Sequence, residues 1–485
     1  MKRKNKLVRP FVGWLCVLLF LFSCKEERKV VGELEGALRL FPDYAGVTIP
    51  YNIAPLNFKV EETAGRWAGR FEGGDKEHSF EVEADNGALD IPIKQWRKLL
   101  ASSIGGEVKV TLLTLTDEGW KSYPSFSLFV AEQPIDDYLA YRLIEPGYAL
   151  WNKMGIYQRN LTDFTETAIY ENKMGRYNCV NCHSFCNHEP EQLLFHLRSH
   201  GGGTVIADHG KVEKIDSRAF DKYAPLVYPC WHPGGRYIAF SSNKTTQDFH
   251  PTQRVEVFDT ASDVVVYDRH EHRLIVSEVT ASPASFETFP AFSPDGKTLY
   301  YCSAAACPMP DSIAQLQYHL CSVSFDPEKG VLGTQADTLY NVREQGGSLS
   351  FPRISPDGRF LMCTRSAYGT FPIWHKDADL YMIDLLKGEG FVPEPLNTED
   401  TESYHSWSSN GRWVVFSSRR LDGLYTRPFI AYIDEEGRAA KPFLLPQKNT
   451  DHYLWLMKSY NLPEFIKGAV DGGAFWNISE EKIKK

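Results

Sequence analysis

Several features that commonly mark an enzyme or a nucleic-acid-binding protein are missing from this sequence. It has no G-x-S-x-G element, no P-loop and no H-E-x-x-H motif, the usual signatures of serine hydrolases, nucleotide-binding proteins and zinc proteases. Basic residues are also in deficit, since 53 lysines and arginines face 62 acidic residues, for a formal charge of −9. Without a basic field the chain is not expected to bind nucleic acid, and no catalytic set stands out.

Long apolar runs are also scarce, and the longest lies at the start of the chain. Residues 11–23 carry no charge, follow a basic stretch, and end in Leu21-Phe22-Ser23-Cys24. This pattern indicates a signal peptide and resembles the lipobox of bacterial lipoproteins, which implies a membrane anchor through lipid on Cys24. The Lys25-Glu26-Glu27 that follows resembles a signal for the outer membrane of Gram-negative bacteria. We therefore expect a signal peptide (1–23), a tether (24–37), and an outer membrane lipoprotein that is periplasmic or surface-exposed.

The second half of the chain repeats itself. Four segments align without gaps around a glycine. Two of them carry the turn sequence Ser-Pro-Asp-Gly and two carry variants of it, and in all four a basic residue and a short apolar strand follow. The segments are "YPCWHPGGRYIAFSSN" (228–243), "FPAFSPDGKTLYYCSA" (289–304), "FPRISPDGRFLMCTRS" (351–366) and "YHSWSSNGRWVVFSSR" (404–419). Because the strand after the glycine is apolar on both faces, it must be covered on both sides, as a central strand of a propeller blade is. Cys363, at an aromatic position of the repeat, is expected to be a small buried hydrophobe.

The repeat resembles the TolB-like family of β-propellers, whose unit centres on the same turn and strand. A weaker fifth unit, 193–216, precedes the four clear ones. The resemblance implies a propeller over 191–465, and closure by strands from both ends of this region would give six blades. A tail (466–485) would follow the propeller.

The region before the propeller is expected to be β-rich as well. Residues 38–132 alternate apolar and polar side chains in "NFKVEE", "SFEVEA", "EVKVTLLTLT" and "SFSLFVAE", which favours an immunoglobulin-like sandwich. The fold class predicted is therefore all-β: an immunoglobulin-like sandwich and a TolB-like propeller. Residues 133–190 would connect the two, with a cysteine cluster where the domains meet.

The cluster "MGRYNCVNCHSFCNH" (174–188) is the main candidate site. Cys179, Cys182 and His183 match the C-x-x-C-H pattern, in which two thiols bind haem c covalently and the histidine ligates its iron. The chain thus resembles bacterial lipoproteins that combine such a segment with a TolB-like propeller. The sixth iron ligand would be one of four residues: Met174, His188, His196 or His200.

Three other interpretations of the cluster stay open. Cys179, Cys182, His196 and His200 have a spacing close to that of a zinc site, provided that the two histidines lie on one helix face. A Cys179–Cys182 disulfide, or a structural pair with Cys186, suits an oxidising compartment. Thiol–disulfide exchange would require a C-x-x-C at a helix start in a βαβ fold, which this sequence does not suggest.

Two functions follow from these patterns. In the first, the protein carries haem c and acts in electron transfer or as a haem-bearing interaction module. In the second, it is a non-enzymatic scaffold whose propeller recognises an envelope protein or a polysaccharide, with structural zinc or a disulfide at the cysteine cluster.

Overall fold

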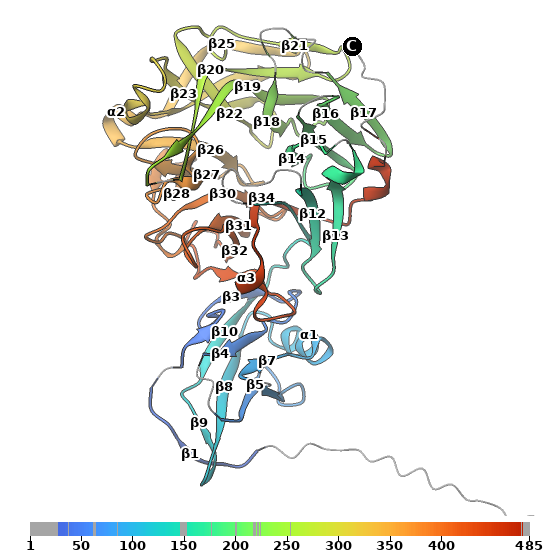
Figure 1. The fold of residues 1–485 in the computed structure, drawn as a ribbon, viewed down its shortest axis with the longest axis vertical. Helices are drawn as coiled ribbons and strands as arrows, with labels where there is room; N and C mark the ends of the chain where they lie inside the picture. Colours follow the sequence, from blue (N-terminus) through green and yellow to red (C-terminus); the bar gives the residue numbers. More distant parts are fainter. Residues whose placement is uncertain are drawn as a thin grey trace, which may run out of the picture.

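The structure is a computed structural model and describes most of the chain. The described residues are 28–36, 38–61, 65–84, 86–145, 153–175, 177–198, 201–216, 220, 223, 225–252, 254–476 and 478. Nearly all of their regular structure is β, in two parts that are joined end to end (Figure 1). The predicted all-β class, with a propeller as the larger part, is confirmed. The predicted signal peptide and the lipid-bearing Cys24 lie outside the described residues.

The larger part contains six four-stranded antiparallel sheets within the described residues, and the sequence predicts six blades. The innermost strand of each sheet contacts the innermost strands of both neighbours, so the sheets form a closed ring (Figure 1). From the innermost strand outward the sheets are β34 (Ser459–Ile466), β11 (Tyr138–Ile144), β12 (Gly155–Asn160), β13 (Glu166–Glu171); β14 (Val180–Phe185), β15 (Gln192–Leu197), β16 (Gly203–Asp208), β17 (Lys211–Ile215); β18 (Leu226–Trp231), β19 (Tyr237–His250), β20 (Arg254–Asp268), β21 (Arg273–Ile275); β22 (Ser285–Phe292), β23 (Thr298–Ala305), β24 (His319–Asp326), β25 (Val331–Tyr340); β26 (Ser348–Ile354), β27 (Phe360–Ser366), β28 (Asp379–Asp384), β29 (Glu389–Phe391); and β30 (Glu402–Trp407), β31 (Trp413–Ser418), β32 (Arg427–Tyr432), β33 (Phe443–Leu444).

The repeated turn joins the first two strands of four sheets, as its sequence predicts. Its glycine has a positive φ in each case, for example 72° at Gly296 and 77° at Gly358, a conformation that favours glycine. The aspartate before the glycine accepts a hydrogen bond from the backbone N–H two residues later, at 3.0 Å for both Asp295 and Asp357. The strand that follows is buried on both faces, and Cys363 within it is fully buried.

The segment predicted as a connector, 133–190, is instead part of the propeller. It holds β11, β12, β13 and β14, so the propeller begins at Tyr138. These strands lack the Ser-Pro-Asp-Gly turn that reveals the others in the sequence. Their sheet is completed by the distant β34, which pairs with β11 from Ile466 opposite Tyr138 to Ser459 opposite Ile144.

The tail predicted after residue 465 also packs against the ring as far as the structure describes it. Val470, Phe475 and Ile478 are buried in a core that they share with strands of the first two sheets. The Gln158 side chain of β12 holds the segment by accepting from the Val470 N–H at 2.7 Å and donating to the Val470 carbonyl at 2.8 Å. The hydrophobic core of the propeller therefore includes residues that follow β34 in the sequence.

The smaller part consists of two sheets and a helix. Its large sheet contains β1 (Val30–Glu33), β3 (Thr48–Pro50), β5 (Trp67–Glu72), β6 (Phe80–Ala84), β8 (Glu107–Thr116), β9 (Gly119–Ser122) and β10 (Phe126–Ala131), and its small sheet contains β2 (Leu40–Phe41), β4 (Phe58–Val60) and β7 (Ala88–Leu89). Helix α1 (Ile93–Ser102) covers the core with Trp96, Leu99 and Leu100. The domain starts earlier than the predicted residue 38, because β1 pairs with β9.

The two parts share one continuous hydrophobic core. Tyr44, fully buried, donates to the Leu444 carbonyl at 3.2 Å, and the Asn57 amide donates to the carbonyls of Gln447 and Lys448. The cysteine cluster, which was predicted at this junction, lies elsewhere, in and around β14 of the ring. None of the helices in the described part of the chain has the length and apolar character needed to span a membrane.

Because β34 closes the ring, its core side chains are expected to support the whole fold. Phe465 is fully buried in the shared core, and we expect Phe465→Ala to lower the free energy of unfolding by about 3–5 kcal/mol. Val331→Ala is the matched control, since Val331 is half exposed on β25 and its truncation should cost less than about 0.5 kcal/mol. Denaturant unfolding followed by circular dichroism measures both values, and equal effects would contradict the role of β34.

Candidate functional site

The innermost strand of every sheet contains a bulge at the same place. One residue there has a left-handed backbone with φ between 47° and 54°, and in each sheet the pairing with the next strand shifts register at this point. The six residues are Cys182, Tyr228, Phe289, Phe351, Tyr404 and Leu462. A non-glycine residue in this conformation costs about 1–3 kcal/mol, so the ring holds six strained positions around its axis.

The four aromatic residues of this set meet across the channel, and we call them the aromatic plug. Ring centroids are 4.6 Å apart for Tyr228 and Phe289, 4.1 Å for Phe289 and Phe351, and 4.9 Å for Phe351 and Tyr404. Tyr228 also contacts Phe351, from a sheet that is not its neighbour, at 5.9 Å. The plug therefore divides the channel into two cavities.

The C-x-x-C-H motif coincides with one of these bulges. Cys182 takes the left-handed position that Tyr404 takes in the last repeat, and His183 takes the position of His405. Proline follows the left-handed residue in the other four innermost strands, at Pro229, Pro290, Pro352 and Pro463. The Cys-His pair is thus a variant of the propeller repeat.

The bulge separates the residues that haem c would need together. Cys179 and Cys182 line a cavity of about 620 Å³, whereas His183 lines another, of about 370 Å³, beyond the plug. Covalent haem attachment requires both thiols and the histidine to face one porphyrin. The arrangement of the three residues does not fit a c-type haem.

The proposed sixth ligands are also dispersed. The Met174 sulfur accepts from the Glu171 N–H at 3.2 Å, His188 Nδ1 lies 3.0 Å from the Phe465 carbonyl in the cavity of His183, and His196 lies beside a third cavity. His200 lies outside the described residues.

The zinc, disulfide and thiol-exchange interpretations of the cluster do not fit the observed geometry either. The zinc site requires a helix that carries both histidines, but His196 lies on strand β15 (Gln192–Leu197) and His200 lies outside the described residues. Among the described residues no three potential metal ligands cluster, and all eight described cysteines are free thiols. Burial raises the pKa of the Cys182 thiol against the opposing charge of Arg198, which makes it a poor nucleophile for disulfide exchange.

The larger cavity, which we call the arginine cavity, contains three guanidinium groups. Arg142, Arg198 and Arg419 line it, and Glu145 is the acidic residue among its lining. Arg142 donates to the Asn461 side chain at 3.0 Å and to the Val180 carbonyl at 3.3 Å. The Asn181 amide oxygen, in the orientation that satisfies both groups, accepts from Arg198 Nε and Nη2 at 3.1 and 3.0 Å. The guanidinium of Arg419 stacks on Trp374 at 3.4 Å.

A long hairpin, β19 and β20, contributes to the wall of the arginine cavity through Thr245, Gln247 and Val257. Its Glu256 carboxylate accepts from the Tyr368 hydroxyl at 3.1 Å and lies 3.2 Å from His375 Nε2. These buried contacts attach the hairpin to the sheet formed by β26–β29.

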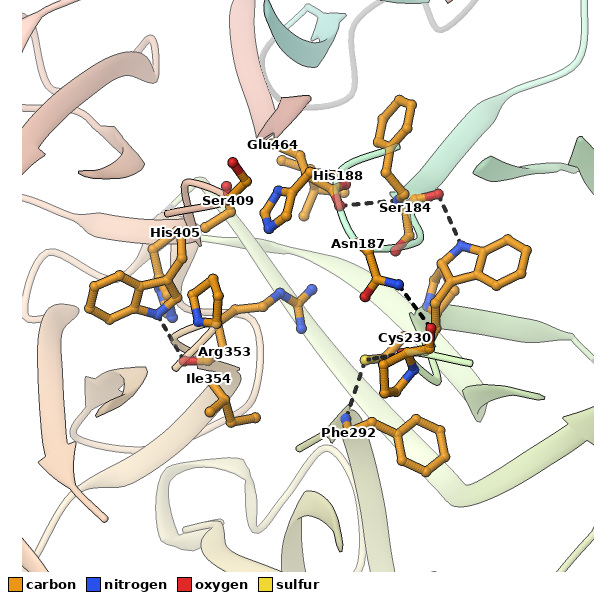
Figure 2. Close-up of a pocket in the computed structure, with 18 of the residues that line it drawn as sticks. Ser184, Asn187, His188, Cys230, Phe292, Arg353, Ile354, His405, Ser409 and Glu464 are labelled. Atoms are coloured by element: carbon orange, nitrogen blue, oxygen red, sulfur yellow. Dashed lines mark hydrogen bonds between the residues drawn. The ribbon is translucent and has the colours of Figure 1, made fainter. Parts of the chain in front are cut away.

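The smaller cavity, which we call the histidine cavity, is shown in Figure 2. His183 and His405 line it together with Arg353 and Glu464, and Arg353 extends into its middle (Figure 2). Both ring nitrogens of His183 are buried and neither forms a hydrogen bond, although the Leu462 backbone lies near the ring. Burial lowers the pKa of His183 and of His405 to about 3, so both imidazoles are neutral at physiological pH.

Glu464 lies across this cavity from neutral and cationic groups. Its carboxylate accepts from the Phe185 N–H at 3.0 Å, but burial outweighs this bond and raises its pKa to about 7. The cavity therefore contains a carboxyl group that changes its charge near neutral pH.

The cationic residues of both cavities were not among the sequence candidates. Arg353 stands in the aligned repeats where the others have Cys230, Ala291 and Ser406, so this departure was visible in the sequence. Arg142 and Arg198 lie on or just after strands β11 and β15, outside the clear repeats, and no sequence signal marks them.

Among the comparisons with known proteins, only the comparison with solved structures finds similar proteins. TolB from Acinetobacter baumannii is 12% identical with a TM-score of 0.45, over 77% of this chain and 85% of its own. The β-propeller domain of the Trilobed protease from Pyrococcus furiosus is 9% identical with a TM-score of 0.34, over 72% and 96%. Prolyl oligopeptidase B from Galerina marginata is 10% identical with a TM-score of 0.37, over 62% and 44%.

No family model matches the sequence, and no curated protein matches it either. Similarity at this level establishes no function, and the propeller rests on the sheets and the ring contacts of the structure itself.

Because the plug separates Cys182 from His183, the chain is expected to acquire no covalent haem. The measurement is a haem stain after denaturing electrophoresis, together with a reduced-minus-oxidised spectrum, of protein expressed with a cytochrome c maturation system. A sharp α-band that disappears in Cys182→Ala would contradict this geometry.

The raised pKa of Glu464 makes stability depend on pH. The folded state holds this proton more tightly than the unfolded state, so the contribution is complete below pH 4.5 and is lost as pH rises through about 7. Glu464→Gln should therefore gain stability relative to the parent as pH increases from 4.5 to 8. Thermal unfolding across this range measures the difference, and parallel pH profiles for the two proteins would refute the assignment.

Proposed function

We propose that this chain is a non-enzymatic binding protein of the cell envelope, anchored by lipid on Cys24, whose arginine cavity takes an acidic glycan. The observation that supports the ligand class is the charge of the cavity: three guanidinium groups and one carboxylate in a chain whose formal charge is −9. A protein that is negative overall concentrates positive charge at a site where it binds an anion.

Arg142 and Arg198 of the arginine cavity can bind such an anionic ligand. Within the described residues, no carboxylate lies within ion-pair distance of Arg142 or Arg198, whose side chains donate instead to the uncharged Asn461, Val180 carbonyl and Asn181. Guanidinium groups bind carboxylates through two parallel hydrogen bonds, which is the interaction that a uronate offers.

The remaining lining suits a polyhydroxylated molecule. Amide and hydroxyl side chains face the cavity from several sheets, among them Gln247, Asn461 and Ser459, and aromatic side chains lie between them. Sugars present both hydroxyl groups and apolar ring faces, so this mixture favours an acidic glycan over a protein side chain. A volume of about 620 Å³ accommodates a short segment of such a chain.

The envelope location rests on the sequence around Cys24. A lipid-anchored protein needs no membrane span of its own, and its propeller would present the arginine cavity to material at the membrane surface. Haem c is not part of the proposal, because Cys182 and His183 line different cavities.

Binding of a uronate tetrasaccharide, measured by titration calorimetry, tests the proposal. We expect Arg142→Gln and Arg198→Gln each to weaken binding by about tenfold or more, since charge-assisted hydrogen bonds contribute about 1.5–3 kcal/mol. Arg343→Gln on α2 (Val342–Gln345) is the matched control: it removes the same charge from an exposed position and should change the affinity less than twofold.

The methyl ester of the tetrasaccharide is the uncharged control and should bind much more weakly than the acid. Equal binding of the acid and its ester, or equal affinity in all three variants, would contradict an acidic-glycan site. Capture of an envelope protein whose binding is insensitive to the tetrasaccharide would favour a protein partner instead.

A further inference from the structure

We propose that the histidine cavity is a second binding site, for a small carboxylate, on the opposite side of the aromatic plug from the arginine cavity. It is independent of the acidic-glycan site, shares none of its arginines, and would exist whether or not that site binds a glycan.

Departures from the propeller repeat converge on this cavity. At the position after the left-handed residue, four strands have proline and two have His183 and His405. At the next position four strands have small residues, and two have Arg353 and Glu464. All four exceptional side chains line the same hollow, and the fold itself does not require them, because other strands of the ring form the same bulge without them.

Arg353 provides the positive charge of the site. Its Nη1 donates to the Pro352 carbonyl at 3.1 Å, and no carboxylate of the described residues lies within ion-pair distance of its guanidinium. Figure 2 shows the side chain extended into the space between Cys230 and His188. Glu464 of the same cavity is the carboxyl group that Arg353 acts on, and when Glu464 is protonated the guanidinium can bind the carboxylate of a ligand.

The two histidines provide neutral hydrogen-bonding groups beside it. His183 is 5% exposed and His405 3%, and a neutral imidazole has one donor and one acceptor nitrogen. His405 Nε2 lies 2.8 Å from the Met362 carbonyl, whereas His183 has no hydrogen-bond partner. The two imidazoles thus form an uncharged part of the wall beside Arg353.

The shape of the cavity limits the ligand to a small molecule. The aromatic plug closes one end through Phe351 and Tyr404, and the aromatic rings of Trp231, Phe292 and Trp407 form part of its wall. A volume of about 370 Å³, lined by these rings and by the polar side chains around Arg353, suits an organic acid of a few carbons.

Glu464 couples this site to pH. An anion beside Arg353 disfavours the ionised form of a nearby carboxyl, so binding should take up a proton at Glu464 and become tighter as pH falls from 8 to 6. The titratable and charged groups around it are Arg353 of β26, Cys230 of β18, His183 of β14, His405 of β30, and His188 and Lys467 next to the strand ends. The two strand histidines stay neutral over this range, and Lys467 is paired with Glu189 at 2.7 Å.

Titration calorimetry with succinate at pH 6 and pH 8, and with the uncharged succinamide, tests the proposal on the full mature chain. Succinate should bind and succinamide should not, with a lower Kd at pH 6. Arg353→Gln should raise the Kd at least tenfold, and Arg343→Gln, the matched surface control, should change it less than twofold. Glu464→Gln should remove most of the pH dependence.

Two further variants distinguish a loss of succinate binding from a loss of the fold. His183→Pro introduces the residue that four of the six strands have at this position, so the fold should persist while the Kd for succinate rises. Arg353→Lys keeps the charge but loses the planar fork, and should bind with intermediate affinity. Thermal unfolding confirms that each variant is folded.

The results also separate this site from the acidic-glycan site. Succinate binding should be unchanged in Arg142→Gln, and tetrasaccharide binding should be unchanged in Arg353→Gln. The proposal is overturned if succinate does not bind at millimolar concentration, or if folded Arg353→Gln binds it as tightly as the parent.

Discussion

The architecture of the channel depends on one backbone feature, the left-handed residue in each innermost strand. A strand without a bulge would direct successive side chains to its two neighbouring sheets, whereas the bulge turns one side chain per strand toward the axis. Four of these six side chains are aromatic, and their stacking energy is gained only when all strands hold the same conformation. The strain at each bulge and the contacts at the centre are therefore mutually dependent, and the two cavities are a consequence of this arrangement.

The same bulge explains why a short motif can mislead. Cys182 and His183 are consecutive, yet the first lines the arginine cavity and the second the histidine cavity. Tyr404 and His405 repeat this division on another strand, although Tyr404 itself reaches both cavities as part of the plug. The spacing of C-x-x-C-H is informative on a helix or a compact turn, where adjacent side chains can converge on one group. On a bulged strand that lines the channel, two consecutive residues can face cavities on opposite sides of the aromatic plug.

Much of the fold could be predicted from the sequence, because its signals are local. The Ser-Pro-Asp-Gly turn, the doubly buried strand after it and the buried Cys363 all follow from short-range patterns. The first sheet could not be predicted, since its innermost strand comes from residues 459–466 and its turns lack the motif. The site could be predicted only in part, for the same reason. Arg353 departs from an aligned repeat and is visible in the sequence. Arg142 and Arg198 lie on or beside strands that meet only in the folded ring, so the sequence does not mark them.

The pairing of β34 with β11 has a consequence for how the protein must be made. The edge of β11 finds its partner only after the chain has emerged beyond residue 466, and the smaller domain packs its core against side chains from residues 443–465. Until then, a growing chain carries an unpaired strand edge and an uncovered apolar face, both of which favour aggregation. Such a topology implies slow, late folding with high contact order. Once closed, the ring and the smaller domain should unfold as one cooperative unit.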